Sequence, residues 1–267
     1  YQDQGERKKI FSSVKRVVIK VGTQLLRGGK NTTSEKRIEE LVEVLANLKK
    51  QGLEIILVSS GAVGFGMAAL QTSVRPKKIA QLQALAAVGQ RHLMSCYGAA
   101  CEKHGFQCAQ LLLTAADLHD QERNRHVAQC VNALLETGVL PIINENDSVC
   151  VDEIRVGDND TLAAYVATML RADLTVILTT VDGMLFCKAG EAELGERLSV
   201  VTALNEEIFQ MARGTDGNQY SVGGMITKLR AAHIVNLSGE ALLIAGGKDF
   251  RNLQRVLDGE DVGTLFL

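Results

Sequence analysis

The chain has 267 residues, of which 46% are hydrophobic, and its formal net charge is -2. This length suits one large α/β domain or two small ones, and the composition is typical of a globular protein. Nucleic-acid-binding domains are usually basic, so the charge argues against that class. No apolar run approaches the roughly 20 residues that a membrane-spanning helix needs, and the polar start lacks the apolar segment of a secretory signal.

The six cysteines form no C-x-x-C pair, and the five histidines are scattered. A structural metal site needs clustered Cys or His ligands, so we predict no metal-binding residue. We interpret the cysteines as free thiols, mostly buried as small hydrophobic side chains, in a protein of a reducing compartment such as the cytoplasm.

Apolar runs and helical patterns alternate along the chain. Continuous apolar runs predict buried strands at 15–23, 53–61, 106–114, 139–146, 174–183 and 240–247. Apolar residues at helical spacing predict helices at 32–52, 61–70, 77–105, 121–138, 161–173, 221–239 and 249–259. Such an alternation is typical of an α/β fold with a mainly parallel sheet covered on both faces.

Local signals refine these boundaries. Thr32 and Glu35 predict a capping box at the start of the helix at 32–52, and Gly52 predicts its end. Gly89 predicts a break in the long helix at 77–105. Residues 1–14 are expected to form an N-terminal tail, and 186–221 an internal insertion of loops around a weak helix.

Two acid–amide clusters suggest a binding site. They are Asn144-Glu145-Asn146-Asp147, at the end of one predicted strand, and Asp158-Asn159-Asp160, before a predicted helix. Ligands of open α/β sheets bind beyond the carboxyl ends of the strands. The other strands deliver Lys20, "SSGAVGFG" and Thr179-Thr180 to the same edge, so polar groups converge there as a small-molecule site requires.

The glycine-rich stretches indicate phosphate binding. A Walker A loop is absent, and the dinucleotide-like spacing of Gly64, Gly66 and Ala69 lacks the acid expected about 20 residues later. Helix N-termini bind anions, and the helix starts at "SSGAVG" and "SVGGMITK" offer such ends. Lys20 and Lys228 lie near these segments, and with Asp160 holding them apart they suit phosphoryl transfer, which needs mainly positioning and charge neutralisation.

Each of these residues also has a simpler interpretation. Lys20 can be a strand-end lysine that extends to solvent, and Asp160 or Asp158 can be a helix N-cap. The cluster at 144–147 can be an ordinary turn. Singly these interpretations suffice, but they leave the repetition of the clusters unexplained.

Six segments resemble the glutamate 5-kinases, a branch of the amino acid kinase family. They are "VVIKVGTQLL", "EIILVSSGAVGFG", "QALAAVGQRHLM", "PIINENDSV", "VGDNDTLAAYVA" and "SVGGMITKLRAA", and their order and spacing match over about 15–267. The pair "NEND" and "GDND" is the most specific part of the match. The resemblance implies a three-layer αβα sandwich, the amino acid kinase fold, over 15–267.

The resemblance also implies an activity and its partners. Such enzymes transfer the γ-phosphoryl group of ATP, with Mg2+, to the side-chain carboxylate of L-glutamate, which opens proline biosynthesis. Proline commonly inhibits them at or near the glutamate site, and family members are usually dimers or tetramers. We therefore expect a homo-oligomer that binds neither nucleic acid nor membranes.

Site roles follow from the same match. Lys20, Lys228 and Asp160 correspond to the catalytic lysines and the acid that orients them. The implied glutamate-binding residues are Ser60, Gly61, Asn144, Asp147 and Asn159. The implied nucleotide-binding residues are Lys20, Thr179, Thr180, Val222, Gly223, Gly224, Met225, Ile226, Thr227 and Lys228.

The charged groups of an amino acid substrate explain why the site has these residue types. Asp147 can pair with the α-ammonium group of a free amino acid, while amides bind its carboxylates. Mg2+ would be held largely by the ATP phosphates, with few protein ligands.

The chain departs from the family pattern at Thr180, where the family often has Asp, which removes a carboxylate near the nucleotide. Many glutamate 5-kinases also carry a C-terminal PUA domain, and the match contains none because it ends where the kinase domain normally stops. A truncated chain, a naturally short enzyme and the kinase part of a bifunctional synthase all stay open. Three alternatives remain open: a sibling kinase acting on N-acetylglutamate, aspartate, carbamate or a nucleotide; a dinucleotide-dependent oxidoreductase; and a non-catalytic amino acid sensor.

Overall fold

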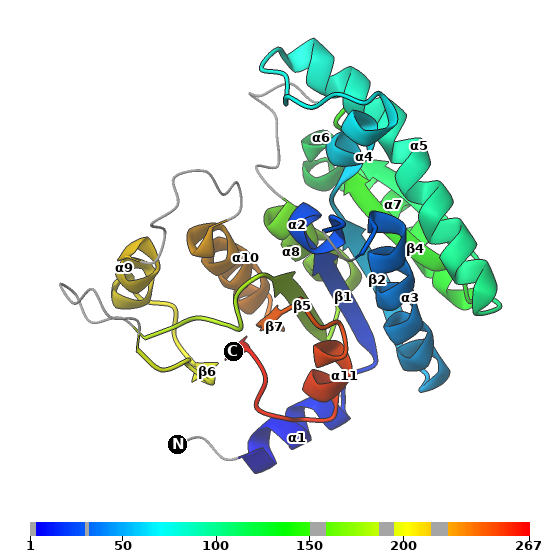
Figure 1. The fold of residues 1–267 in the computed structure, drawn as a ribbon. Coiled ribbons are helices and arrows are strands. Elements are labelled where there is room, and N and C mark those ends of the chain that lie inside the picture. The colour runs from blue at the N-terminus through cyan, green and yellow to red at the C-terminus, as the bar shows by residue number, and fades with distance from the viewer. Residues whose placement is uncertain (1–3, 30–31, 150–158, 187–194, 215–223) are drawn as a thin grey trace. The chain divides into compact units, whose positions relative to one another are not determined.

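The computed structural model describes residues 4–29, 32–149, 159–186, 195–214 and 224–267. The chain divides into two compact units, one made of 1–20 and 160–267 and the other of 21–159. We refer to them as unit 1 and unit 2. Most elements of both units are labelled in Figure 1.

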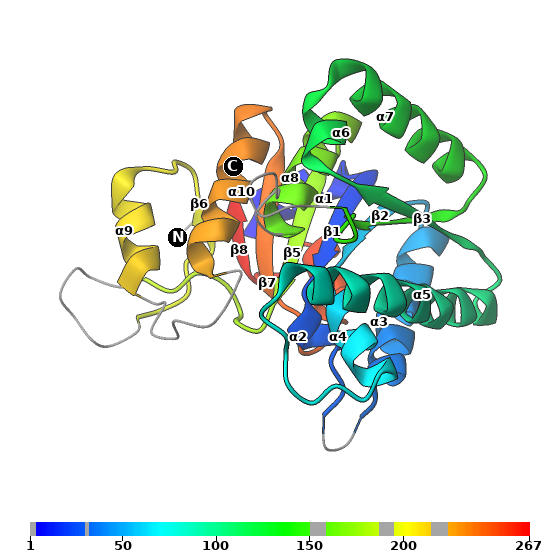
Figure 2. The ribbon, with the colours of Figure 1, turned by 90° about the horizontal axis from the view of Figure 1, so that it is seen from above.

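Unit 2 contains three parallel strands in the order β3-β4-β2. They are β2 (Glu54–Ser59), β3 (Cys108–Leu113) and β4 (Leu140–Glu145). The helices of unit 2 are α2 (Thr23–Leu26), α3 (Ser34–Lys50), α4 (Ala62–Ala69), α5 (Ile79–Lys103), α6 (Ala115–His119) and α7 (Gln121–Glu136). Figure 2 shows α6 and α7 on one face of these strands and α3, α4 and α5 on the other.

Unit 1 contains strands in the order β1-β5-β7-β8-β6. They are β1 (Arg16–Val21), whose last residue belongs to unit 2, β5 (Leu174–Thr179), β6 (Val200–Val201), β7 (Ala241–Gly246) and β8 (Thr264–Phe266). Strand β7 is parallel to β5 and antiparallel to β8. The strands of both units are thus mainly parallel, as the sequence predicts.

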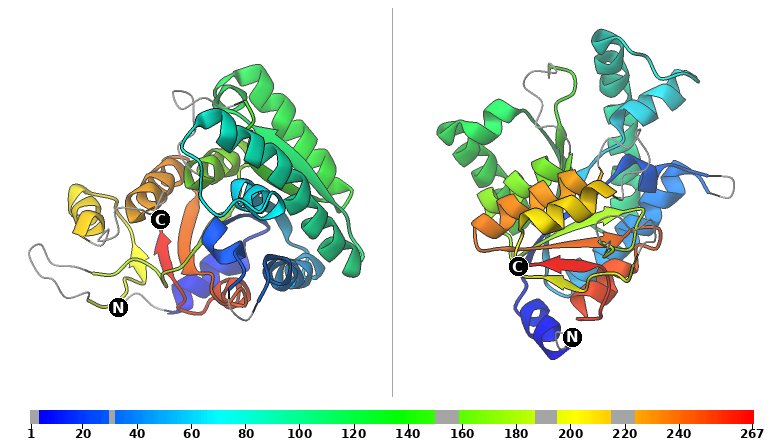
Figure 3. Two further views of the ribbon diagram at one scale, coloured as in Figure 1. Left: turned by 45° about the horizontal axis from the view of Figure 1, so that its top comes forward. Right: turned by 90° about the vertical axis from the view of Figure 1, so that its left-hand side faces the viewer.

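Helices cover both faces of the strands in unit 1. They are α1 (Gln4–Ser12), α8 (Asn159–Leu170), α9 (Glu206–Gly214), α10 (Met225–Leu237) and α11 (Asn252–Leu257). The right-hand view of Figure 3 shows α8 and α10 above the strands and α1 and α11 below them. Each unit therefore has the three layers of the predicted αβα sandwich. In the described part of the chain, no helix is long and apolar enough to cross a membrane.

Several local expectations need correction. Residues expected to form a tail contain α1, and Arg7 of this helix is buried and forms an ion pair with Asp261. The N-cap of α3 is Thr33, whose hydroxyl accepts a hydrogen bond from the backbone N–H of Lys36 at 3.2 Å, and not Thr32. Either threonine can act as an N-cap, and a helix boundary read from sequence is accurate only to one or two residues.

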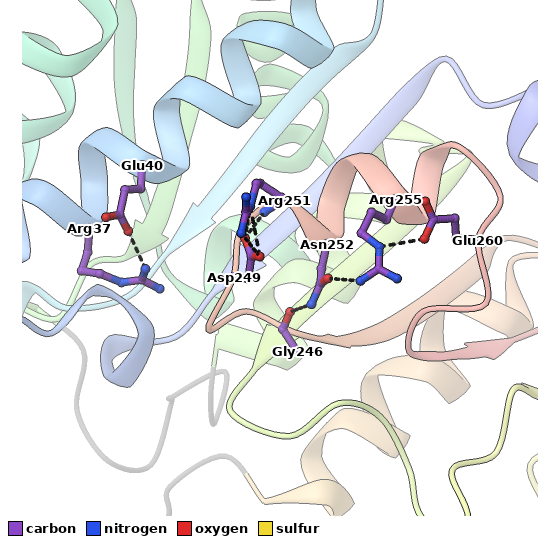
Figure 4. Close-up of polar contacts among 8 residues, drawn as sticks. All are labelled: Arg37, Glu40, Gly246, Asp249, Arg251, Asn252, Arg255 and Glu260. Atoms are coloured by element: carbon purple, nitrogen blue, oxygen red, sulfur yellow. Dashed lines mark hydrogen bonds and ion pairs between the residues drawn. The ribbon is translucent and has the colours of Figure 1, made fainter.

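The end of β7 is tied to the helix that follows it. Asn252, in the first turn of α11, donates a hydrogen bond to the carbonyl of Gly246 at 2.9 Å (Figure 4). Arg255 on the next turn bonds to Asn252 and to Glu260. These bonds fix the loop beyond the carboxyl end of β7, on the rim where Thr179 of β5 is paired with Gly246.

Gly89 does not break the long helix, because α5 is continuous from Ile79 to Lys103. A Cβ atom at Gly89 would overlap the carbonyl oxygen of Ala62 in α4, and one at Gly66 would overlap that of Leu85 in α5. The two glycines therefore let the backbones of α4 and α5 touch. Gly66, which takes part in the dinucleotide-like spacing, is required by this packing.

We predict that Gly89→Ala destabilises the protein by about 2 kcal/mol or more, because overpacking outweighs the better helix propensity of alanine. Gly98→Ala on the same helix is the matched control. A Cβ atom there meets nothing within 4 Å, so this change should stabilise the protein, by up to about 1 kcal/mol. Urea unfolding of both variants makes the measurement, and equal effects of the two changes would contradict close packing at Gly89.

Candidate active site

The first cluster of the site is an ion-pair triad inside unit 1. Lys20, the fifth residue of β1, places its Nζ 2.6 Å from Oδ1 of Asp160, and Lys228 on α10 places its Nζ 3.1 Å from Oδ2. The Asp160 side chain has no solvent exposure, and the two lysines are 8% and 4% exposed. The structure thus brings together the three residues predicted to be catalytic.

The charge state of this triad is set by its burial. Removal from water would raise the pKa of Asp160, but the two ammonium groups outweigh that effect and hold its pKa below the usual range. The hydroxyl of Thr227 lies 2.9 Å from the same Oδ2 atom and also donates toward the carbonyl of Gly224. Asp160 is therefore an ionised acceptor that fixes two cations, and one positive charge is left over in the triad.

The N-terminus of α10 lies beside this triad. Gly224 is its N-cap, with no side-chain cap, and Thr227 and Lys228 lie in the first turns. Backbone N–H groups in the first turn of a helix favour anions. Met225 and Ile226 lie in the same turn, whereas Val222 and Gly223 fall outside the described residues.

Thr179 and Thr180, which the sequence predicts to contact the nucleotide, lie at the rim of β5 and β7. The carbonyl of Thr179 accepts a hydrogen bond from the N–H of Gly247 at 2.7 Å, and Thr180 is exposed. A Cβ atom at Gly246 would overlap the carboxylate of Asp182. The rim therefore has a carboxylate two residues after Thr180, that of Asp182. From the sequence, only the replacement of the family's Asp by Thr180 was noted, and this nearby acid was missed.

The second cluster is an amide and hydroxyl network inside unit 2. Nδ2 of Asn159 donates to Oγ of Ser60 at 2.6 Å and to Oδ1 of Asn144 at 3.0 Å. Asn144 is 3% exposed, and its Nδ2 donates to Oε1 of Gln90 at 3.0 Å. Three of the predicted glutamate-binding residues are therefore in direct contact.

The backbone around this network is specialised at Gly61. This residue is the N-cap of α4, and its φ of 117° lies in a region that favours glycine. The preceding residue, Ser60, donates its backbone N–H to the carbonyl of Val21 at 3.1 Å. The tight turn from β2 into α4 thus presents the Ser60 hydroxyl beside the amides.

Asp147 lies in the turn that follows β4 and is partly exposed. Its neighbour Asn146 anchors this turn by donating its backbone N–H to the carbonyl of Leu113 at 2.7 Å. The structure thus places the Asp147 carboxylate three residues along the chain from Asn144, on an anchored turn.

Gln90 is a member of the network that the sequence analysis did not single out. It lies on the buried face of α5 with 8% exposure. A glutamine on the apolar face of an otherwise Ala-rich helix is the signal that could have identified it, because a buried amide needs a partner.

The carboxylate oxygens of Asp160 are occupied by the two lysines. Within the described ranges no group of three or more His, Cys, Asp or Glu side chains could hold a metal ion. A magnesium ion bound to ATP phosphates would fit, since that ion needs few protein ligands.

The chain is similar to known proteins in both sequence and fold. The model of the amino acid kinase family matches residues 15–245. A glutamate 5-kinase of Clostridium acetobutylicum is 40% identical, with 98% of this chain and 97% of that protein aligned. A glutamate 5-kinase of Caldanaerobacter subterraneus is 42% identical over 94% of this chain and 68% of its own length. A carbamate kinase structure from Giardia lamblia has a TM-score of 0.65 at 20% identity, covering 96% of this chain and 99% of that one, which indicates a shared fold.

We predict that Asp160→Asn lowers the free energy of unfolding by about 3 kcal/mol at pH 7, because it removes the charge that two buried ammonium groups face. The depressed pKa of Asp160 means that its contribution is present above its unfolded pKa of about 3.9 and is lost only as pH falls through the folded value. The deficit should therefore be equal at pH 5.5 and pH 8 in urea unfolding.

Asp182→Asn is the control for this measurement, since it removes an exposed carboxylate of the same unit. It should leave the unfolding free energy unchanged. A stability of Asp160→Asn equal to that of this control would rule out a structural role for the triad.

Proposed function

This chain belongs to the amino acid kinase family, and we propose that it transfers the γ-phosphoryl group of ATP to the side-chain carboxylate of L-glutamate. The product is L-glutamyl 5-phosphate, and the reaction is the first step of proline biosynthesis. The observation that carries the proposal is the buried triad of Asp160 with Lys20 and Lys228, in a chain aligned over nearly its whole length with glutamate 5-kinases.

The triad supplies the electrostatics of phosphoryl transfer. In the transition state, charge spreads over the oxygens of the transferred group, and fixed cations stabilise it without reorganising. Lys20 and Lys228 are held by Asp160 within 3.1 Å, so their ammonium groups are positioned before ATP binds. MgATP is the substrate form, and the N–H groups at the start of α10 would bind its phosphates together with the lysines.

The rim of β5 completes the proposed binding site for the nucleotide. Thr179, Thr180 and the turn at 224–228 are its proposed contacts, together with Val222 and Gly223, which match the family motif. Asp182 offers the carboxylate that the Thr180 position lacks, against the backbone of Gly246. We assign it to a hydroxyl of the ribose, because a carboxylate accepts hydrogen bonds from hydroxyl groups.

Glutamate is bound by the amide network. Ser60 and Gly61, with Asn144 and Asn159, present hydroxyl and amide groups to its carboxylates, and Asp147 pairs with its α-ammonium group. The attacking side-chain carboxylate is already ionised at pH 7, so no general base is needed. Asn159, proposed to bind glutamate, and Asp160, which orients the lysines, are consecutive residues at the start of α8. A single peptide unit therefore separates their Cα atoms.

Three further properties belong to the same proposal. Proline inhibits by competing for the groups that bind the α-ammonium and α-carboxylate groups of glutamate. The chain acts as a dimer or tetramer, and the reaction takes place in the cytoplasm, in keeping with the free cysteines among the described residues.

The substrate test compares L-glutamate with N-acetyl-L-glutamate in an ADP-release assay with MgATP, with hydroxylamine present to trap the acyl phosphate. We expect turnover with free glutamate alone, because acetylation removes the ammonium group that pairs with Asp147. Turnover of the acetylated acid would support kinase activity but contradict the assignment of L-glutamate as the substrate. No turnover of either acid in a protein that binds glutamate would indicate a sensor.

A second prediction tests the triad. Lys228→Ala should lower kcat by about 100-fold or more, the scale expected when one preorganised charge-stabilising group is lost. Arg230→Ala removes an exposed cation from the same helix and should leave kcat unchanged. Unchanged turnover of a folded Lys228→Ala variant would remove Lys228 from the mechanism.

A further inference from the structure

Two cysteine side chains of unit 2 are hydrogen-bonded to each other. Cys101 lies in the last turns of α5, and Cys108 is the first residue of β3. Cys101 is fully buried and Cys108 is partly exposed. The activity described above gives neither thiol a role.

The turn between helix and strand brings the two residues together. Helix α5 ends at Lys103, Gly105 has a φ of 78°, and the N–H of Phe106 donates to the carbonyl of Cys101 at 3.3 Å. This chain reversal folds the start of β3 back against the helix end. Thiols in hydrogen-bond contact need only a short approach to reach the bond length of a disulfide.

The two thiols are chemically unequal. The hydrogen bond from the Cys101 thiol lowers the pKa of Cys108, while that bond and then burial raise the pKa of Cys101. The thiolate is the reactive form of cysteine, and it reacts where it is accessible. Cys108 therefore combines the more acidic thiol with the more exposed position, and Cys101 is its buried neighbour.

We propose that Cys101 and Cys108 form a redox-active dithiol that a peroxide oxidises to an intramolecular disulfide. The Cys108 thiolate attacks one peroxide oxygen, the O–O bond breaks, and the protonated leaving oxygen departs as water. The Cys101 sulfur then attacks the sulfenic acid sulfur of Cys108, the S–O bond breaks, and a second water leaves. Two thiols are thereby oxidised by two electrons, and hydrogen peroxide is reduced to two waters.

One face of α5 connects this pair to the amide network. Tyr97 lies one turn before Cys101, is fully buried, and shares a 2.8 Å hydrogen bond with the hydroxyl of Ser59, the residue before Ser60. Further along the same face, Gln90 bonds to Asn144. Drawing the end of α5 toward β3 would act on both contacts, since helices transmit such shifts as rigid elements.

A consequence for binding follows, and it rests on the proposed function. Oxidation should raise the KM for glutamate about fivefold or more, the lower end of typical coupling between sites. Reduction with dithiothreitol should restore the original value.

The chemical test is mass spectrometry of the whole chain after hydrogen peroxide treatment and blocking of the remaining thiols. We expect a dithiothreitol-sensitive link between the tryptic peptides 92–103 and 104–123, which accounts for the loss of one alkylation site in each peptide. Tandem fragmentation assigns the link to Cys101 rather than Cys96 in the first peptide. Absence of this link at peroxide levels that oxidise Cys130 would overturn the proposal.

Variants separate the pair from general oxidation. Cys108→Ser and Cys101→Ser should form no link, and their KM for glutamate should not respond to peroxide. Cys130→Ser removes an exposed cysteine of α7 and should behave as the unmodified protein. A KM response retained in Cys108→Ser would exclude the pair as its cause.

The two proposals fail in different ways. A protein that forms the link but turns over no glutamate when reduced would contradict the proposed function and leave the dithiol established. A protein that turns over glutamate with an unchanged KM after the link forms would contradict the coupling through α5.

Discussion

The burial of one carboxylate between two ammonium groups is the constraint on which the candidate active site depends. Asp160 has no solvent exposure, and a buried acid would normally be neutral because desolvation penalises its charged form. Lys20 and Lys228 reverse this outcome, and their own burial is in turn tolerable only because Asp160 is charged. The triad is stable as a unit, and it retains one excess positive charge that a polyphosphate group can neutralise.

This excess charge is the property that would let the triad serve the proposed catalysis as well as structure. An ion pair with equal charges would gain little from an anionic ligand, whereas a buried cationic cluster gains more as negative charge develops nearby. The N-terminus of α10 adds N–H groups of the same polarity, and Thr227 fixes its first turn to Asp160. The triad and the N-terminus of α10 therefore both favour negative charge at the same place in unit 1.

The three residues of the triad could be predicted from the sequence because each belongs to a recognisable local motif. Lys20 ends an apolar strand, Asp160 starts a helix, and Lys228 follows a glycine pair, so each could be placed on an element from its neighbours alone. The mainly parallel strands followed from unbroken apolar runs in the same way. Gln90 gave only a weaker signal, an amide on the apolar face of a helix, because its partner Asn144 lies far away in sequence and meets it only through folding.

Other features depend on contacts that no local pattern encodes. Helix α1 was not predicted, since its polar sequence gives little sign of burial, and Arg7 is buried there through its pairing with Asp261 near the other end of the chain. Strand β8 is only three residues long and is defined by its antiparallel partner β7. The choice of Thr33 over Thr32 as N-cap belongs to the same class, because both residues have equal intrinsic preference.

Gly89 shows most clearly how packing overrides propensity. A glycine within a helix weakens it by about 1 kcal/mol relative to alanine, which is why a break is the natural expectation. In α5 that cost is offset because the absent side chain lets the backbone of α4 approach, and α4 follows directly from the Ser60–Gly61 turn. The close contact of the two helices thus fixes α5 against the turn that presents the Ser60 hydroxyl. Gln90 and Tyr97 on this helix are thereby positioned from both sides, by packing at Gly89 and by their own hydrogen bonds, so α5 connects its own C-terminal end to the amide network and to Ser59.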